Sequence, residues 1–400
     1  IKSYFPSQVV SDAEKLSYDY GLKVAKAIET EWFYDDRSQT RYDTNFNNFH
    51  RLRLYARGEQ PVQKYKDELS INGDLSYLNL DWTPVPIIPK FVDIVVNGIA
   101  DRAFEIKAHS QDEYGIAKRT EYMESILGDM AAREMNDFAA QEFGINLYEN
   151  DPETLPENQE ELELHMQLSY KQAVEIAEEQ AINVLLKGND YDLIKRRLYY
   201  DLTVLGIAAV KTSFTTSDGV TIDYVDPADL VYSYTESPYF DDIYYVGEVK
   251  TIPINELVKQ FPHLTQSDLE EIQNSGYTQK NNYHYGGPRY EDADRNKVQV
   301  LYFNYKTYMN EVYKVKETGS GAMKLIEKDD SFNPPTDAQG NFSKLERAIE
   351  TLYEGALVLG TNKLLKWEMS ENMMRSKSNF TKVKMNYSIV APRMYKGKIE

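Results

Sequence analysis

The 400-residue chain has no cysteine, only three tryptophans and no long apolar run. Without cysteine it can form no disulfide, no thiolate metal site and no cysteine nucleophile. No apolar stretch approaches the roughly 18 residues that a membrane-spanning helix needs, and no signal-like segment opens the sequence. We therefore expect no membrane contact and no cysteine chemistry.

The common catalytic and cofactor-binding motifs are also missing. The sequence has no phosphate-binding loop of the Walker type, no His-Glu-x-x-His, no Gly-x-Ser-x-Gly and no Gly-x-Gly-x-x-Gly, and its five histidines are scattered. Asp292, Asp294 and Asn296 imitate the start of a calcium loop, but Lys297 stands where glycine is needed and Phe303 where a bidentate glutamate is needed. We expect no cofactor and no metal.

One enzyme class stays open as an alternative. An acidic glycoside hydrolase needs little more than two carboxylates, and the sequence is rich in carboxylates and tyrosine. Asp241 and Asp242 form the best local pair. Adjacent residues of a strand point to opposite faces, so the pair is poorly placed to act on one bond. The expectation is that the protein is not an enzyme.

Charge is abundant and unevenly distributed. The 45 Lys and Arg and 64 Asp and Glu give a net charge of −19, which disfavours tight wrapping of nucleic acid. Residues 351–400 hold nine basic and four acidic residues, a local net charge of +5. This basic bias either faces DNA or an acidic partner or is a solvated surface. The candidate contact residues are Lys382, Lys384, Arg393, Lys396 and Lys398.

Helical spacing dominates the first half of the chain. It predicts helices over 9–33 and over 45–56, the second closed by Gly58, then an irregular stretch at 69–82. A further amphipathic helix is expected over 112–143.

A helix predicted over 89–104 is apolar on most of its circumference. Pro89 suits its first turn. The polar residues that recur along one narrow stripe are Lys90, Asp93, Asn97 and Asp101. Such a helix is either ordinary core or a contact with a neighbouring subunit.

A long helix is expected over 154–188. Thr154 and Glu157 have capping-box spacing, and the helix would span on the order of 50 Å. Its predicted buried face begins at Leu162 and ends at Leu185. Asn189 or Asp190 would cap another helix, which leads to Gly206.

Strands and short helices follow. We expect a hairpin of 207–214 and 220–225 across Ser217-Asp218-Gly219, a corner at Asp226-Pro227, a strand at 243–250 and a helix at 255–261. In the C-terminal part, the sequence pattern predicts a linker at 281–296 and a β-rich unit at 297–370. That unit would hold strands at 298–303 and 308–315, a flexible tip at 317–344, and a hairpin of 352–359 and 363–367 across 360–362.

The order of these motifs resembles the portal proteins of tailed bacteriophages, most closely those of crAss-like phages. Residues 54–60 resemble a Tyr-x-x-Gly-x-Gln turn, and 89–98 the helix after it. Residues 206–261 resemble the strand-and-helix run of the wing, and 298–367 the clip. The segment from Ala391-Pro392 onward resembles the approach to the second stem helix.

The resemblance implies a mainly helical α+β portal fold. The expected regions are a wing over 1–280 with a small sheet at 207–250, a linker or stem approach over 281–296, and the clip over 297–370. Residues 371–400 would return toward the second stem helix, with the chain truncated there.

The resemblance also implies a function. Portal subunits form a ring, usually of twelve copies, at one vertex of the capsid in the virion, and assemble in the host cytoplasm. Their partners are the major capsid protein, the terminase, the tail adaptors and the double-stranded DNA that passes through the channel during packaging and ejection. An acidic channel would let DNA pass without binding it. A non-portal scaffold or adaptor of the same virion is a further alternative to this interpretation.

Overall fold

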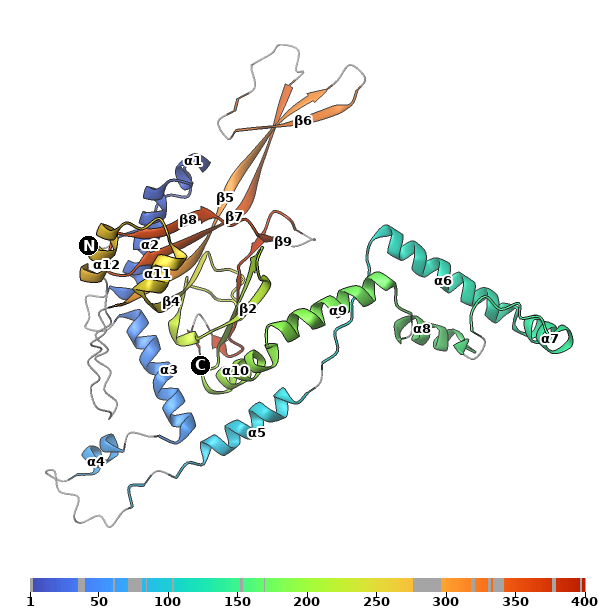
Figure 1. The fold of residues 1–400 in the computed structure, drawn as a ribbon, viewed down its shortest axis with the longest axis horizontal. Coiled ribbons are helices and arrows are strands. Elements are labelled where there is room, and N and C mark those ends of the chain that lie inside the picture. The colour runs from blue at the N-terminus through green and yellow to red at the C-terminus, as the bar shows by residue number, and fades with distance from the viewer. Residues whose placement is uncertain are drawn as a thin grey trace. The chain divides into compact units, whose positions relative to one another are not determined.

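Two compact units make up the chain (Figure 1). Unit 1 combines Ile1–Asp101 with Leu193–Glu400, and unit 2 is Arg102–Asp192. Helix exceeds strand, and the paired strands are antiparallel, which is compatible with the expected α+β class. The computed structural model describes residues 3–34, 40–59, 62–70, 81–83, 85–102, 104–151, 154–168, 170–275, 296–317, 321–329, 332–333, 342–375, 379–395 and 398–399.

The helix predicted over 9–33 is divided in two. α1 spans Asp12–Lys15 and α2 spans Tyr18–Phe33. Ser17 separates them, because its hydroxyl accepts a hydrogen bond from the backbone N–H of Tyr20 at 3.2 Å and so begins a new helix. The prediction of one continuous helix was therefore wrong at this cap.

The next helices follow the sequence pattern more closely. α3 spans Arg41–Arg57 and ends at Gly58, whose φ is +78°, as predicted. α5 spans Ile88–Ala100 with a proline in its first turn, as predicted, but it ends four residues before the predicted end at 104. α4 (Gln63–Leu69) was not predicted. A Cβ at Gly58 would lie 2.6 Å from Cβ of Pro86, so glycine lets the segment before α5 approach α3 closely.

The described residues of unit 2 include the four helices α6 to α9, and two predictions fail there. α6 (Glu113–Ala131) and α7 (Arg133–Phe143) replace the single helix predicted over 112–143, because the chain leaves helical geometry at Ala132. α8 (Gln159–Leu168) and α9 (Ala173–Gly188) replace the long helix predicted over 154–188. No helix of the described residues is long and apolar enough to cross a membrane.

The cap that separates α8 from α9 explains the second failure. Gln172 and Glu175 form the capping box, with the Glu175 carboxylate accepting a hydrogen bond from the backbone N–H of Gln172 at 3.0 Å. The predicted box at Thr154 and Glu157 does not begin a helix. The predicted buried face is wrong as well, because Leu162 is buried but most of the apolar side chains of α9 are exposed.

A three-stranded sheet follows α10 (Tyr191–Val204). β1 (Ala208–Thr215) and β2 (Gly219–Val225) form the predicted hairpin, in which Thr215 pairs with Gly219. β11 (Tyr387–Val390) pairs with the other edge of β1, which gives the order β11-β1-β2. The C-terminal part of the chain thus completes a sheet that begins near residue 208.

The second sheet has six strands and combines strands from the predicted small sheet at 207–250 with strands from the predicted β-rich unit at 297–370. Its main path is β3-β4-β5-β7-β8, and β6 pairs with β5. The predicted small sheet at 207–250 is therefore wrong, because β4 belongs to this sheet while β1 and β2 do not. The strands are β3 (Leu230–Tyr232), β4 (Tyr245–Pro253), β5 (Lys297–Glu317), β6 (Met323–Lys328), β7 (Phe342–Val358) and β8 (Leu364–Met369).

β5 is one strand of 21 residues, where the sequence predicted two at 298–303 and 308–315. Its first half pairs with β4 and β7, and its second half pairs with β6 and β7. β6 lies inside the predicted flexible tip at 317–344, so residues 323–328 of the tip form a paired strand. We call the paired residues 312–317 of β5, 323–328 of β6 and 342–346 of β7 the ribbon (Figure 1).

α2 packs against the six-stranded sheet through aromatic side chains. The Trp32 indole N–H donates to the Tyr245 hydroxyl at 3.0 Å, and both residues are buried. On β8, Trp367 stacks on Tyr353 at 5.0 Å between ring centroids. Trp367 also donates its indole N–H to the carbonyl of Lys15 at 2.9 Å, which joins the start of the chain to the sheet.

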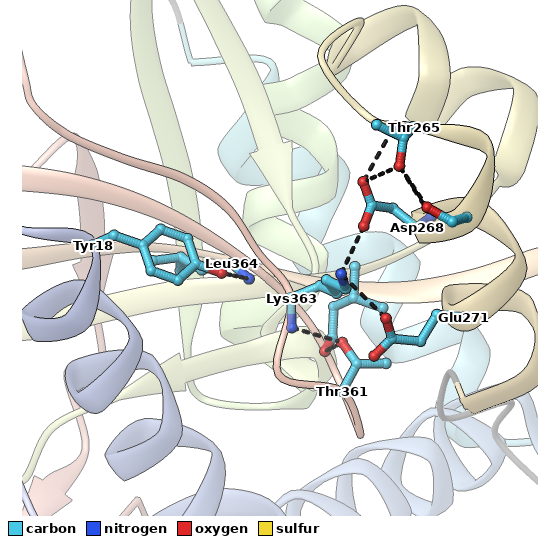
Figure 2. A network of polar contacts seen from close by, with 9 residues as sticks. Tyr18, Thr265, Asp268, Glu271, Thr361, Lys363 and Leu364 are labelled. Atoms are coloured by element: carbon cyan, nitrogen blue, oxygen red, sulfur yellow. Dashed lines mark hydrogen bonds and ion pairs between the residues drawn. The ribbon is translucent and has the colours of Figure 1, made fainter.

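A polar network holds α12 to the turn between β7 and β8 (Figure 2). α11 (Ile254–Gln260), close to the predicted helix, and α12 (Gln266–Ser275), which was not predicted, follow β4. The Lys363 ammonium lies 2.6 Å from Asp268 and 3.1 Å from Glu271. The hydrogen bond from Lys363 is the largest cause of the lowered pKa of Asp268.

The C-terminal part contains short strands. They are β9 (Met374–Arg375), β10 (Val383–Lys384), β11, β12 (Met394–Tyr395) and β13 (Lys398–Ile399). The return of 371–400 toward a second stem helix, which the resemblance implies, stays a prediction. The linker at 281–296, most of the stretch at 69–82 and much of the tip lie outside the described residues.

Gly21 tests the contact between α2 and β8. A Cβ at Gly21 would lie 2.4 Å from Cγ of Trp367. We expect Gly21→Ala to lower the free energy of unfolding by about 1–3 kcal/mol, because the stacked Trp367 must shift. Thermal unfolding followed by calorimetry measures the change.

Gly128→Ala is the matched control. Gly128 is also helical, but nothing lies within 4 Å of the position that a Cβ would take there. We expect this change to leave the unfolding temperatures unchanged or to raise one of them, since alanine favours helix over glycine. An equal loss in both variants would contradict the proposed role of the Trp367 contact.

Candidate functional site

Four arginines from two helices line one cleft in unit 1. Arg53 and Arg57 lie one turn apart on α3 and therefore share a face. Arg196 and Arg197 lie on α10. The cleft has a volume of about 590 Å³, and its lining is Arg53, Arg57, Val96, Arg196, Arg197, Tyr200, Asp201, Tyr224 and Asp226.

Arg53 joins the walls of this cleft. Its guanidinium donates two hydrogen bonds to the Asp226 carboxylate, at 2.9 and 2.8 Å, and one to Asp201 at 3.1 Å. Burial alone would lower its pKa, but the hydrogen bonds and charges of Asp226 and Asp201 raise the pKa of Arg53 above its ordinary value. α3, α10 and the corner after β2 are thus linked through one side chain.

The two carboxylates are held by further local contacts. Asp226 caps the short 3-10 helix η2 (Pro227–Asp229) by accepting from the backbone N–H of Ala228 at 2.9 Å, so the predicted Asp-Pro corner is confirmed. Asp201 accepts a hydrogen bond from the Tyr224 hydroxyl. Burial raises the pKa of Asp201, against the opposing effects of Tyr224 and Arg53.

A second buried pair lies beside this network. The Tyr42 hydroxyl donates to Asp229 at 2.8 Å, which connects α3 to η2. Burial is the largest cause that raises the pKa of Asp229 to about 6, and the charge of Asp226 adds to it. Burial likewise raises the pKa of Tyr42.

α5 borders the cleft with one side and exposes apolar side chains elsewhere. Val96 is buried and lines the cleft. The buried Lys195 of α10 donates to the carbonyl of Ala100 at 3.2 Å, which holds the end of α5. The interpretation of this helix as ordinary core is not supported within one chain. From Ile87 to the end of α5, the exposed large apolar residues are Ile87, Ile88, Phe91, Ile94, Val95 and Ile99, with Phe91 60% exposed.

The five basic residues singled out in the sequence do not form a single described cluster. Lys382, in the bend before β10, and Lys384 are exposed on either side of the buried Val383. Arg393 is exposed in the turn before β12. No hydrogen bond or ion pair joins it to either lysine in the described part of the chain. Lys396 lies outside the described residues, as does the side chain of Lys398.

A larger cavity of about 910 Å³ lies between β8 and the β1–β2 hairpin and bears on the hydrolase alternative. Glu354 lines it and accepts from Lys366 at 2.9 Å and from Ser370 at 2.8 Å. Although burial alone would raise the pKa of Glu354, these hydrogen bonds and the charge of Lys366 hold it below its usual value. A glycosidase acid needs a raised pKa, so this carboxylate is unsuited to that role.

The Asp241–Asp242 pair gives the hydrolase no support either. The two residues lie in a turn before β4 and not on a strand, which corrects the expected placement. Asp242 accepts hydrogen bonds from the Thr235 hydroxyl and from the backbone N–H of Glu236, so it closes its own loop. These bonds lower the pKa of Asp242 against the effect of burial.

The described residues contain no group of three or more His, Asp or Glu placed to hold a metal ion. No protein-family model matches the chain, and no curated protein matches it significantly.

The arginine cleft was not predicted from the sequence. Its only local signals are the four-residue spacing of Arg53 and Arg57 and the adjacent Arg196 and Arg197, and neither shows that α3 lies beside α10.

Asp229 generates a prediction about pH. A carboxyl whose pKa is raised on folding stabilises the folded state most at low pH, and that contribution is lost as pH rises from about 4 toward 6. Asp229→Asn keeps an acceptor for Tyr42 and removes the charge. We expect the variant to gain roughly 1–2 kcal/mol of unfolding free energy relative to wild type between pH 4 and 7. Urea denaturation at several pH values measures this difference.

Asp223→Asn, which changes an exposed carboxylate on β2, is the control. Its stability should follow that of the wild type across the same pH range. Parallel curves for wild type and Asp229→Asn would show that Asp229 is ionised equally easily in the folded and unfolded chains.

Proposed function

We propose that the chain is a subunit of a ring that forms the portal of a tailed-phage capsid. The exposed apolar side chains of α5 carry this proposal, together with the order of motifs that resembles portal proteins. In this proposal the ring sits at a capsid vertex of the virion. It contacts the major capsid protein, and the terminase and then the tail adaptors dock on it while double-stranded DNA passes through its channel.

The size of the apolar face suits repeated contacts better than a single pair. Burying an aliphatic or aromatic side chain is worth about 1.5–3 kcal/mol, so the six half-exposed side chains at and before α5 supply on the order of 5–9 kcal/mol. Association itself costs about 4–15 kcal/mol, which one such contact only just offsets. A closed ring forms as many contacts as it has subunits, and in each head-to-tail contact this face would meet a different surface of the neighbouring subunit.

Unit 2 supports the same proposal. Its helices expose further large apolar residues, which a protein that acts alone has little reason to keep at its surface. The clearest are Ile116, Met135, Phe138, Phe143, Val174 and Val184, each more than half exposed.

Charge substitution on α5 tests the ring. Phe91→Glu with Ile94→Glu adds two negative charges to the apolar face, and we expect it to convert rings into single subunits. Mass photometry and negative-stain electron microscopy report the assembly state. The control adds the same charge on the polar stripe of the same helix through Lys90→Gln with Asn97→Glu, and it should assemble as wild type.

Four results would count against the portal. A wild-type chain that stays monomeric at tens of micromolar, or a double variant that assembles normally, removes the role of α5. Assemblies without a hole wide enough for duplex DNA favour a scaffold or adaptor. Hydrolysis of a polysaccharide by the single subunit favours the hydrolase.

The ribbon generates a second prediction. Lys316 pairs with Phe342, so replacing residues 317–341 with Asn-Gly closes β5 and β7 through a two-residue turn. If the ribbon belongs to the clip, this variant should still form rings and should lose binding to the terminase or tail adaptor. Co-sedimentation with the purified partners measures that loss. Failure to form rings would contradict the placement of the ribbon at a docking end.

A further inference from the structure

The cleft between α3 and α10 holds more positive charge than its own carboxylates neutralise. Four arginines line it, against Asp201 and Asp226. Both carboxylates bind Arg53. Among the described residues, Arg57, Arg196 and Arg197 have no ion pair within 4 Å. This local excess stands in a chain whose net charge is −19.

The excess is unfavourable for the helices that carry it. Like charges four residues apart on a helix destabilise it by a few tenths of a kcal/mol, and Arg53 and Arg57 have that spacing. Asp201 and Asp226 compensate Arg53 alone. A bound anion would offset the remaining charge.

The cleft is also organised before any ligand arrives. Arg197 lies over the ring of Tyr224 at 4.3 Å from the centroid, and the Tyr224 hydroxyl is held by Asp201. A guanidinium that stacks through its face keeps the N–H groups at its edge for hydrogen bonds. Arg53 is fixed by its paired hydrogen bonds to Asp226. Two of the four arginines therefore have defined positions.

From these contacts we propose that the cleft binds a phosphate group. The donors of Arg57, Arg196 and Arg197 outnumber what one carboxylate can accept, because a carboxylate offers two oxygens and one charge. A phosphate offers more acceptor oxygens and up to two charges, and arginine binds it through paired hydrogen bonds. The volume of about 590 Å³ leaves room for a phosphate with an attached group.

The net charge of the chain does not prevent this binding. At physiological ionic strength the Debye length is about 8 Å, so the local arginines outweigh more distant carboxylates. The phosphate can come from a small phosphate compound or from the backbone of nucleic acid. The site does not depend on the proposed ring, because all its residues lie in unit 1 of one chain.

Isothermal titration with inorganic pyrophosphate at 0.15 M salt tests the site. Arg57→Gln with Arg196→Gln removes two donors that have no ion pair in the described residues, so the fold should persist, which circular dichroism checks. We expect pyrophosphate to bind the wild type and to bind this variant at least about tenfold more weakly. Arg57→Lys with Arg196→Lys keeps the charge without the paired donors and should fall between the two.

Arg51→Gln is the matched control, because Arg51 is exposed on the same helix and does not line the cleft. It should change the affinity by less than twofold. Competition by a 20-base-pair DNA duplex would assign the phosphate to nucleic acid, and binding of pyrophosphate without such competition would assign it to a small compound. Either result supports the site.

Three results overturn the proposal. The first is no heat of binding at millimolar pyrophosphate. The second is equal affinity of pyrophosphate for the wild type and the double glutamine variant. The third is tighter binding of a hexaglutamate peptide than of pyrophosphate, which would make the cleft a docking site for an acidic protein segment. Mass photometry of the same samples reports the ring separately, so failure of the site and failure of the ring are distinguishable.

Discussion

The guanidinium of Arg53 is the contact on which the arrangement of unit 1 around the cleft depends. It binds one carboxylate from α10 and one from the corner after β2, residues 148 and 173 positions away in the chain. Asp201 is buried, whereas Arg53 and Asp226 are partly exposed, so removal of Arg53 would leave the buried Asp201 carboxylate without its charged partner and would destabilise the fold.

The position of α5 follows from this arrangement. Its preceding segment passes close to Gly58 at the end of α3, and its last carbonyl binds Lys195 of α10. With both ends held, the helix buries Val96 and leaves the apolar side chains on its other faces in contact with solvent. The basic cleft and the apolar face therefore lie on two sides of one helix, and each suits a different kind of partner.

Local signals in the sequence predicted local structure well. The end of α3 was predicted from Gly58, because a left-handed φ favours glycine. The β1–β2 hairpin was predicted from Ser217-Asp218-Gly219, because a tight turn needs such residues. The cap at Ser17 was missed because apolar spacing does not register a cap. The membership of β4 in the same sheet as β5 was missed for a different reason, since pairing between strands about 50 residues apart depends on the folded core. The arginine cleft depends on the same long-range packing.

One consequence of the 21-residue length of β5 concerns mechanics. A single extended strand of this length reaches on the order of 65 Å, from the core beneath α2 to the pairing with β6. Its hydrogen bonds to β7 continue without interruption from Val300 to Lys316. A force applied at the far end is therefore transmitted as twist and shear through one stiff ladder, and no hinge lies between the ribbon and the aromatic core to absorb it.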